Sequence, residues 1–260
     1  MSRLRQIWAW TRFTLSEYAR SGRIMIELVA TIAFVWLFLR KPISNVTVHP
    51  FNADHFFNLA AIFTLLTTVY TATVVAGLGQ RAQGYVVLAR SLGRRGYLYG
   101  LFFVPVIINT LIFLALSVIV TIINRPQPGW NLLIWAAGAL PLVLDIALVA
   151  AIVMLLSGLV LSPGWRLVVL GVVALALLGN TNFFDQKTGT APPGGFGRIL
   201  EALQTLLGIP LTPIMAGFEL AARRMYSAQS AAVILGQVAL LVAVLAFAVF
   251  AFERRDVILS

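Results

Sequence analysis

Six long apolar stretches constrain the fold of this chain more than any other feature of its sequence. A helix that crosses a bilayer needs about 20 mostly apolar residues. These stretches are apolar on every side, as lipid-embedded helices are, and they lack the alternation of barrel strands. The sequence therefore predicts an all-α, polytopic integral membrane protein with six transmembrane helices, at residues 24–39, 56–78, 100–123, 132–161, 166–180 and 229–252.

The composition agrees with a membrane protein. Hydrophobic residues make up 60% of the chain and charged residues 11%, whereas soluble proteins average roughly 45–50% and about 25%. There is no cysteine and there are only two histidines, which excludes a disulfide framework, a thiolate metal site and a cysteine nucleophile. We expect a single transmembrane domain over residues 1–260, with no catalytic residue, no bound metal and no cofactor of its own.

The net charge of +10 is interpreted here as a topological signal. In a soluble protein it would indicate nucleic acid, but in a membrane protein basic residues collect on the cytoplasmic side. The basic residues are densest in residues 1–23 and 81–95. We therefore expect a multi-pass protein of the plasma membrane with both termini in the cytoplasm, and no nucleic-acid partner.

Residues 1–23 precede the first apolar stretch and mix arginine with aromatic residues. Arg5 and Arg12 fall on one face of a helix and Trp8 near another, which is typical of a helix that lies in the membrane interface. We interpret Arg5, Trp8 and Arg12 as its anchors to the lipid bilayer. The alternative is an ordinary cytoplasmic tail.

The segment 81–95 combines four arginines, Arg81, Arg90, Arg94 and Arg95, with an apolar stripe that includes Leu88 and Leu92. A short helix with an apolar face and a basic rim is suited to docking in a groove of a cytoplasmic partner. It is equally suited to lying on anionic headgroups. The residues alone leave both interpretations open.

The region before the last stretch predicts a helical hairpin over residues 198–225. Two short amphipathic helices flank a break at 208–213 that contains two prolines, which cannot continue a helix. Each helix is too short to span a bilayer. The pattern indicates a re-entrant hairpin in the outer leaflet, where such backbone is tolerated only under a cover of protein or water.

A few polar residues interrupt the apolar stretches. Asp145 lies in the middle of 132–161, where a carboxylate is costly and is by default a functional hypothesis. It could contact substrate or relay protons; alternatively it could bond a polar group on a neighbouring helix, such as Asn109, or be protonated. Glu27 is expected to pair with a cytoplasmic arginine. A hydroxyl-bearing face could line a translocation path or hold helices together; it consists of Thr64, Thr67, Thr68 and Thr71.

The order of these features resembles the membrane subunits, or permeases, of ABC type-2 transporters. The resemblance covers nearly the whole chain and rests on the interfacial helix, the six spans, the basic helix between spans two and three, and the broken hairpin before span six. Three local sequences support it: Gln83-Gly84-Tyr85 with Leu88 to Leu92, then Arg94-Arg95-Gly96-Tyr97, and the final Phe252-Glu253-Arg254-Arg255.

The resemblance implies a bacterial exporter in the inner membrane. Two permease chains, identical or homologous, would form a path, each resting on a separate ATPase subunit that binds ATP and Mg²⁺. No G-x-x-x-x-G-K-[ST] phosphate loop occurs in this chain, so the chain itself is not expected to be an enzyme. The docking surface would be the 81–95 coupling helix, through Arg81, Gln83, Gly84, Tyr85, Leu88, Arg90, Leu92, Arg94 and Arg95.

Two rival functions remain. A secondary transporter or channel without an ATPase partner would predict inverted repeats and several charged residues within the membrane, and the sequence shows Asp145 and no clear repeat. An integral-membrane enzyme would predict a catalytic cluster at one membrane depth, which the sequence does not contain.

Overall fold

The computed structural model describes residues 3–39, 53–80, 93–124, 132–162, 164–170, 212–223 and 228–254, and these form helices and short turns without a strand. The helices are α1 (Arg3–Arg20), α2 (Arg23–Phe34) with the π-helix η1 (Val35–Leu39), α3 (Ala53–Gly79), α5 (Gly93–Asn124), α6 (Leu132–Leu156), α10 (Thr212–Arg223) and α11 (Ala228–Arg254).

Four of the described helices are long and apolar enough to cross a membrane. The segments are Phe56–Gly79, Gly93–Ile122, Trp135–Leu156 and Ser230–Arg254. They coincide with four of the six expected spans, and the chain is a multi-pass membrane protein of helices. The first expected span, 24–39, falls on α2 and η1, whereas the fifth, 166–180, is described only as far as residue 170. Both remain predictions.

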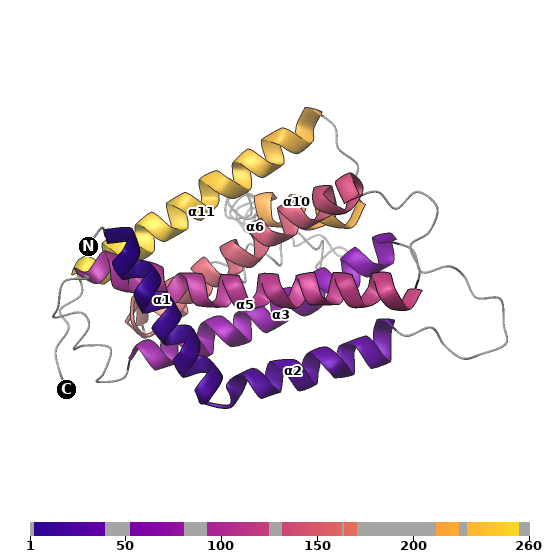
Figure 1. Ribbon diagram of the computed structural model, residues 1–260. Coiled ribbons are helices and arrows are strands. Elements are labelled where there is room, and N and C mark those ends of the chain that lie inside the picture. Colours follow the sequence, from indigo (N-terminus) through magenta and orange to yellow (C-terminus); the bar gives the residue numbers. More distant parts are fainter. Residues whose placement is uncertain are drawn as a thin grey trace, which may run out of the picture.

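The long helices form a bundle in which neighbours in sequence run in opposite directions. Figure 1 shows α2, α3, α5 and α6 alternating in direction, with α11 ending beside the start of α1. Helix α3 packs between α5 and α6, and α11 packs mainly on α6. One apolar core, which includes Tyr97, Leu101 and Phe252, lies at the end of the bundle near α1. A second, which includes Phe56, Phe113 and Leu142, lies toward the opposite end.

Helix α1 does not continue α2 but crosses the end of the bundle. The axes of the two helical segments differ by 72°, and the bend lies at Gly22, whose φ of 73° is in the left-handed region that favours glycine. In Figure 1, α1 runs across the ends of the long helices and packs chiefly on α5. The predicted N-terminal helix is therefore present. Its contact with lipid remains a prediction.

The two segments that the resemblance singles out are described only in part. Of the expected 81–95 helix, the last three residues form the first turn of α5, which begins at Gly93; residues 81–92 lie outside the described part. Of the hairpin at 198–225, only the second arm is described, as α10. Helix α10 is covered by α6, α11 and α3.

Candidate functional site

The described part of the expected docking surface consists of Arg94 and Arg95, and both side chains bond to the end of α11. The Arg95 guanidinium donates to the Glu253 carboxylate at 2.6 and 3.2 Å, and Arg94 donates to the Glu253 backbone carbonyl. Arg95 remains largely exposed. The sequence analysis expects these two arginines to bind an ATPase subunit. In the structure both bond Glu253 of the same chain. The other seven, Arg81, Gln83, Gly84, Tyr85, Leu88, Arg90 and Leu92, lie outside the described residues.

A close fit at Gly100 attaches α1 to α5. A Cβ atom at Gly100 would overlap the Trp10 ring, so the absence of a side chain lets the two helices approach. The Trp10 ring stacks on Tyr97 with centroids 5.0 Å apart, and the Thr11 hydroxyl donates to the Gly100 carbonyl at 3.3 Å. Tyr97 in turn donates to the Gly79 carbonyl at 2.6 Å. The start of α5 therefore links α1 to the end of α3.

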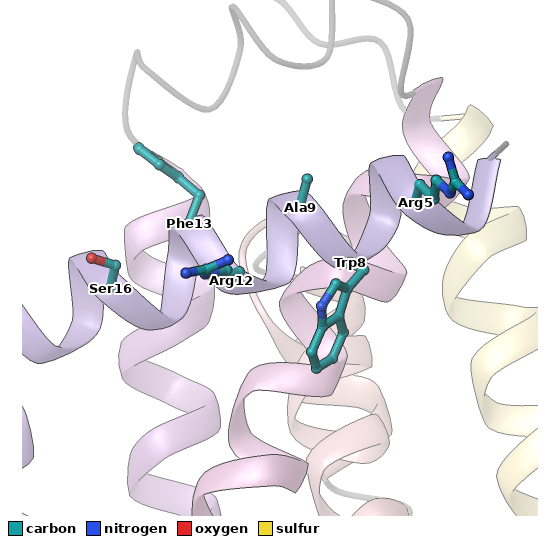
Figure 2. Close-up of a pocket in the computed structure, with 6 residues that line it drawn as sticks. All are labelled: Arg5, Trp8, Ala9, Arg12, Phe13 and Ser16. Carbon is teal, nitrogen blue, oxygen red and sulfur yellow. The ribbon is translucent and has the colours of Figure 1, made fainter. Parts of the chain in front are cut away.

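The opposite face of α1 is open and carries the three residues expected to anchor it. Figure 2 shows Arg5, Trp8 and Arg12 along a shallow groove on this helix, together with Ala9, Phe13 and Ser16. Trp8 is 61% exposed although it is a large apolar side chain. Basic and aromatic side chains on an exposed helix face are the composition of interfacial helices. Arg5, Trp8 and Arg12 thus border one groove, whereas the sequence placed Trp8 near a different face from the two arginines, and their role as lipid anchors remains a prediction.

The hydroxyl-bearing face of α3 is buried inside the bundle. Each hydroxyl donates to a backbone carbonyl of its own helix, for example Thr64 to Ala60 at 2.7 Å and Thr68 to Thr64 at 2.6 Å. Such bonds satisfy a hydroxyl without a partner on another helix. Thr64, Thr67, Thr68 and Thr71 are therefore buried among the described helices, and their role in a translocation path remains a prediction.

Thr71 also belongs to a buried polar network that joins four helices. The Glu27 carboxylate accepts hydrogen bonds from the Tyr18 hydroxyl at 2.6 Å and from the Thr71 hydroxyl. The Asn109 amide donates to the Thr71 hydroxyl at 3.1 Å and to the Pro105 carbonyl at 2.9 Å. Among the described residues Glu27 has no arginine partner, contrary to expectation: both hydroxyl groups bond Oε1, and Oε2 is buried without a hydrogen-bond partner. Asn109 likewise bonds here and not to Asp145.

Asp145 lies in a second buried junction, where α6, α10 and α11 meet. One carboxylate oxygen, Oδ1, accepts a hydrogen bond from Gln237 Nε2 at 2.7 Å, and Nε2 also donates to the Pro141 carbonyl at 3.2 Å. Gly217 on α10 faces this pair, and a Cβ there would overlap the Gln237 amide. Asp145 therefore has a polar neighbour on another helix, which agrees with the structural alternative, but the neighbour is Gln237.

Sequence reasoning missed Gln237, Tyr18 and Gly217. Gln237 is a polar residue in the middle of an otherwise apolar span, which indicates a buried polar contact but does not identify Asp145 as its partner. Tyr18 and Gly217 carry no such signal, because tyrosine and glycine are common in membrane helices and at their interfaces. Among the described residues, no group of three or more metal-binding side chains is present.

Comparisons with protein-family models, with curated proteins and with solved structures found no match to this chain.

Proposed function

We propose that this chain is the permease subunit of an ATP-driven exporter of the ABC type-2 kind. It would form the substrate path as a dimer and rest on separate ATPase subunits, which bind ATP and Mg²⁺. The orientation proposed places both termini in the cytoplasm of a bacterial cell. The order of elements along the sequence is the basis of the proposal, and one arrangement in the structure supports it.

The supporting arrangement is a basic end of the bundle crossed by α1. Helix α1, the start of α5, residues 164–170 and the end of α11 all lie at this end (Figure 1). The opposite end has far fewer basic residues among the described side chains. A basic end is expected to face the cytoplasm, where an ATPase would be found. The basic side chains at this end are those of Arg5, Arg12, Arg20, Arg23, Arg94, Arg95, Arg166 and Arg254.

The flanks of the expected coupling segment lie at the same end. Helix α3 ends at Gly79 and α5 begins at Gly93, and the bond from Tyr97 to the Gly79 carbonyl holds these two helix ends together. The two helix ends that flank this segment in sequence therefore both lie at the basic end of the bundle. A partner that pressed on this segment would act directly on α5, and through Trp10 on α1.

Two apolar surfaces support the proposed dimer. The span in α11 is the least buried of the four, and its exposed side chains include Leu235, Val242 and Phe247. Helix α2 likewise exposes Met25 and Val29. A bilayer can cover both helices, and a second permease chain would cover part of the same surface.

Co-purification tests the proposal directly. A tagged chain extracted in mild detergent is expected to bring down an ATPase subunit, and the pair in vesicles is expected to transport only with ATP. The Leu88→Asp and Leu92→Asp double variant is expected to lose the ATPase, because charge replaces its apolar stripe. The Leu88→Met and Leu92→Met double variant keeps apolar side chains at both positions and is expected to retain the partner.

Transport that proceeds without an ATPase would contradict the proposal and favour a secondary transporter or channel. Equal recovery of the ATPase with the aspartate and methionine variants would overturn the assignment of the 81–95 segment. Each variant should first be shown to run as a monodisperse species in gel filtration, so that loss of the partner is not loss of the fold.

A further inference from the structure

The junction around Asp145 contains two buried acceptor atoms that lack a donor. Asp145 and Gln237 are both fully buried, and among the described residues Asp145 Oδ2 and Gln237 Oε1 have no hydrogen-bond partner. The orientation of the amide follows from its neighbours, because Nε2 faces two acceptors, Asp145 Oδ1 and the Pro141 carbonyl. Reversing the amide would place its oxygen against both of them. The amide oxygen Oε1 is therefore the atom that lacks a donor, and this does not result from a reversed amide.

A proton on Asp145 would change the balance of donors and acceptors at this junction. An ionised carboxylate is only an acceptor, whereas a protonated one has an O–H donor. A proton on Oδ2 would remove the buried charge and give the carboxyl group a donor, and Oε1 is an unpaired acceptor on the amide that the 2.7 Å bond already joins to it. We propose that Asp145 is a buried proton-binding site and that its protonated form holds α6, α10 and α11 together.

Among the side chains that the structure describes, the surrounding helices place no positive charge beside Asp145. Burying an unpaired carboxylate is far more costly than burying a hydrogen-bonded neutral group. Helices α3, α5, α10 and α11 pack against α6. The buried polar side chains described on α3 are threonines, and the titratable side chain described on α3 is Tyr70. The charged side chains that the structure describes on the other three are remote or exposed: Arg94 and Arg95 on α5, Glu219 on α10, and Glu253 and Arg254 on α11.

Gly217 makes the junction sensitive to the charge of Asp145. Its backbone lies against the pair, with the position of an absent Cβ 3.1 Å from Asp145 Oδ1. Loss of the proton would leave a bare carboxylate between three closely packed helices, and separation of α10 and α11 from α6 would admit water to it. Proton release is thus coupled to opening of this junction. The inference does not depend on an ATPase partner, so it can fail or succeed separately from the proposed function.

Thermal unfolding of the purified full-length chain in detergent, measured from mildly acidic to mildly alkaline pH, tests the site. The wild-type midpoint is expected to fall by several degrees as pH rises, because the folded chain must then bury a charge or retain a proton that the unfolded chain releases. Asp145→Asn is expected to weaken this dependence and to leave the part that comes from the buried Glu27 carboxyl, since the asparagine amide can donate to Gln237 Oε1 and does not titrate. Glu219→Gln, which changes an exposed carboxyl on α10, is the matched control and should keep the wild-type profile.

Infrared spectroscopy provides a second readout. The wild type is expected to show the carbonyl band of a protonated carboxyl group, absent from Asp145→Asn and shifted in Gln237→Leu, which removes the acceptor. If Asp145→Asn does not fold, the band and its shift in Gln237→Leu decide the question. Absence of the band, or equal pH dependence in the wild type and Asp145→Asn, would overturn the proposal. Stabilisation of the wild type by sodium over choline, lost in Asp145→Asn, would also overturn it in favour of a metal cation.

Discussion

The contact between Gly100 and Trp10 determines whether α1 can lie on the bundle. The indole ring occupies the space that any other residue at position 100 would fill. Trp10 is 9% exposed and belongs to the core at this end, although it lies in a helix with arginines on its other face. A single glycine therefore permits an amphipathic helix to join the interior of the protein.

Gly100→Ala is expected to lift α1 from α5 and to lower the free energy of unfolding by about 1–3 kcal/mol, because the added methyl overlaps a buried ring. Limited trypsin digestion should then cut faster at Arg5 and Arg12. Gly77→Ala is the control, since nothing lies within 4 Å of a Cβ at that position. Equal digestion of both variants would show that the approach at Gly100 does not hold α1.

Thr71 occupies the centre of the Glu27 network, and its neighbour Thr73 provides a matched comparison. Thr71→Val is expected to lower the free energy of unfolding by about 1–3 kcal/mol, because Glu27 loses a donor and Asn109 loses an acceptor inside the bundle. Thr73 is exposed and bonds only its own helix at Val69, so Thr73→Val should change stability by less than about 0.5 kcal/mol. Denaturant titration of both variants measures the difference, and similar losses would contradict the network.

At the scale of elements, the joint between α1 and α2 sets the direction in which the chain enters the bundle. The bend of 72° requires one residue in the left-handed region, and Gly22 supplies it with a φ of 73°. The joint is otherwise open, because nothing lies within 4 Å of a Cβ at Gly22. Backbone conformation alone therefore limits which residues are tolerated there.

Gly22→Ala is expected to destabilise the joint by about 1–2 kcal/mol, the cost of placing an ordinary residue in the left-handed region. Gly22→Asn should be milder, because asparagine adopts that region more readily. Thermal midpoints of the two variants, measured in the same detergent, give the comparison. An alanine variant as stable as the wild type would indicate that α1 can turn by another route.

At the scale of the whole molecule, the basic residues and the two ends of the described chain share one end of the bundle (Figure 1). Arg5 on α1 and Arg254 on α11 are both exposed there. Since both lie at the same end of helices that cross a membrane, they must reach the same compartment. The proposed orientation places this basic end in the cytoplasm.

The absence of native cysteine allows this sidedness to be measured with single-cysteine variants. Arg5→Cys and Arg254→Cys are expected to react with a membrane-impermeant maleimide only after cells are lysed. Ser44→Cys should react in intact cells, because residue 44 lies between the first two expected spans, which is the outer side if both termini are cytoplasmic. Labelling of Arg5→Cys and Arg254→Cys on opposite sides would contradict the architecture, and reversal of all three would contradict only the orientation.

Much of this architecture follows from the sequence, because apolar length and basic clustering are local properties of the chain. The spans at 56–78, 100–123, 132–161 and 229–252 all coincide with long helices. The partners of buried polar groups were less predictable. Glu27 bonds Tyr18, which lies beyond a bend, and Asp145 bonds Gln237, 92 residues away. Such pairs depend on how helices pack, and helix packing is decided by many side chains together.

The contacts of α5 with both α1 and α11 also have a consequence for biosynthesis. Helix α1 is made first, but its docking position at Gly100 belongs to a helix made later, so α1 cannot dock until α5 has been synthesised. The bonds of Arg94 and Arg95 to Glu253 form later still, because Glu253 lies 158 residues after Arg95. Chains folding from the N-terminus during synthesis therefore complete this end of the bundle only when the last helix has left the ribosome. The nascent protein exposes an unfinished basic surface until that moment.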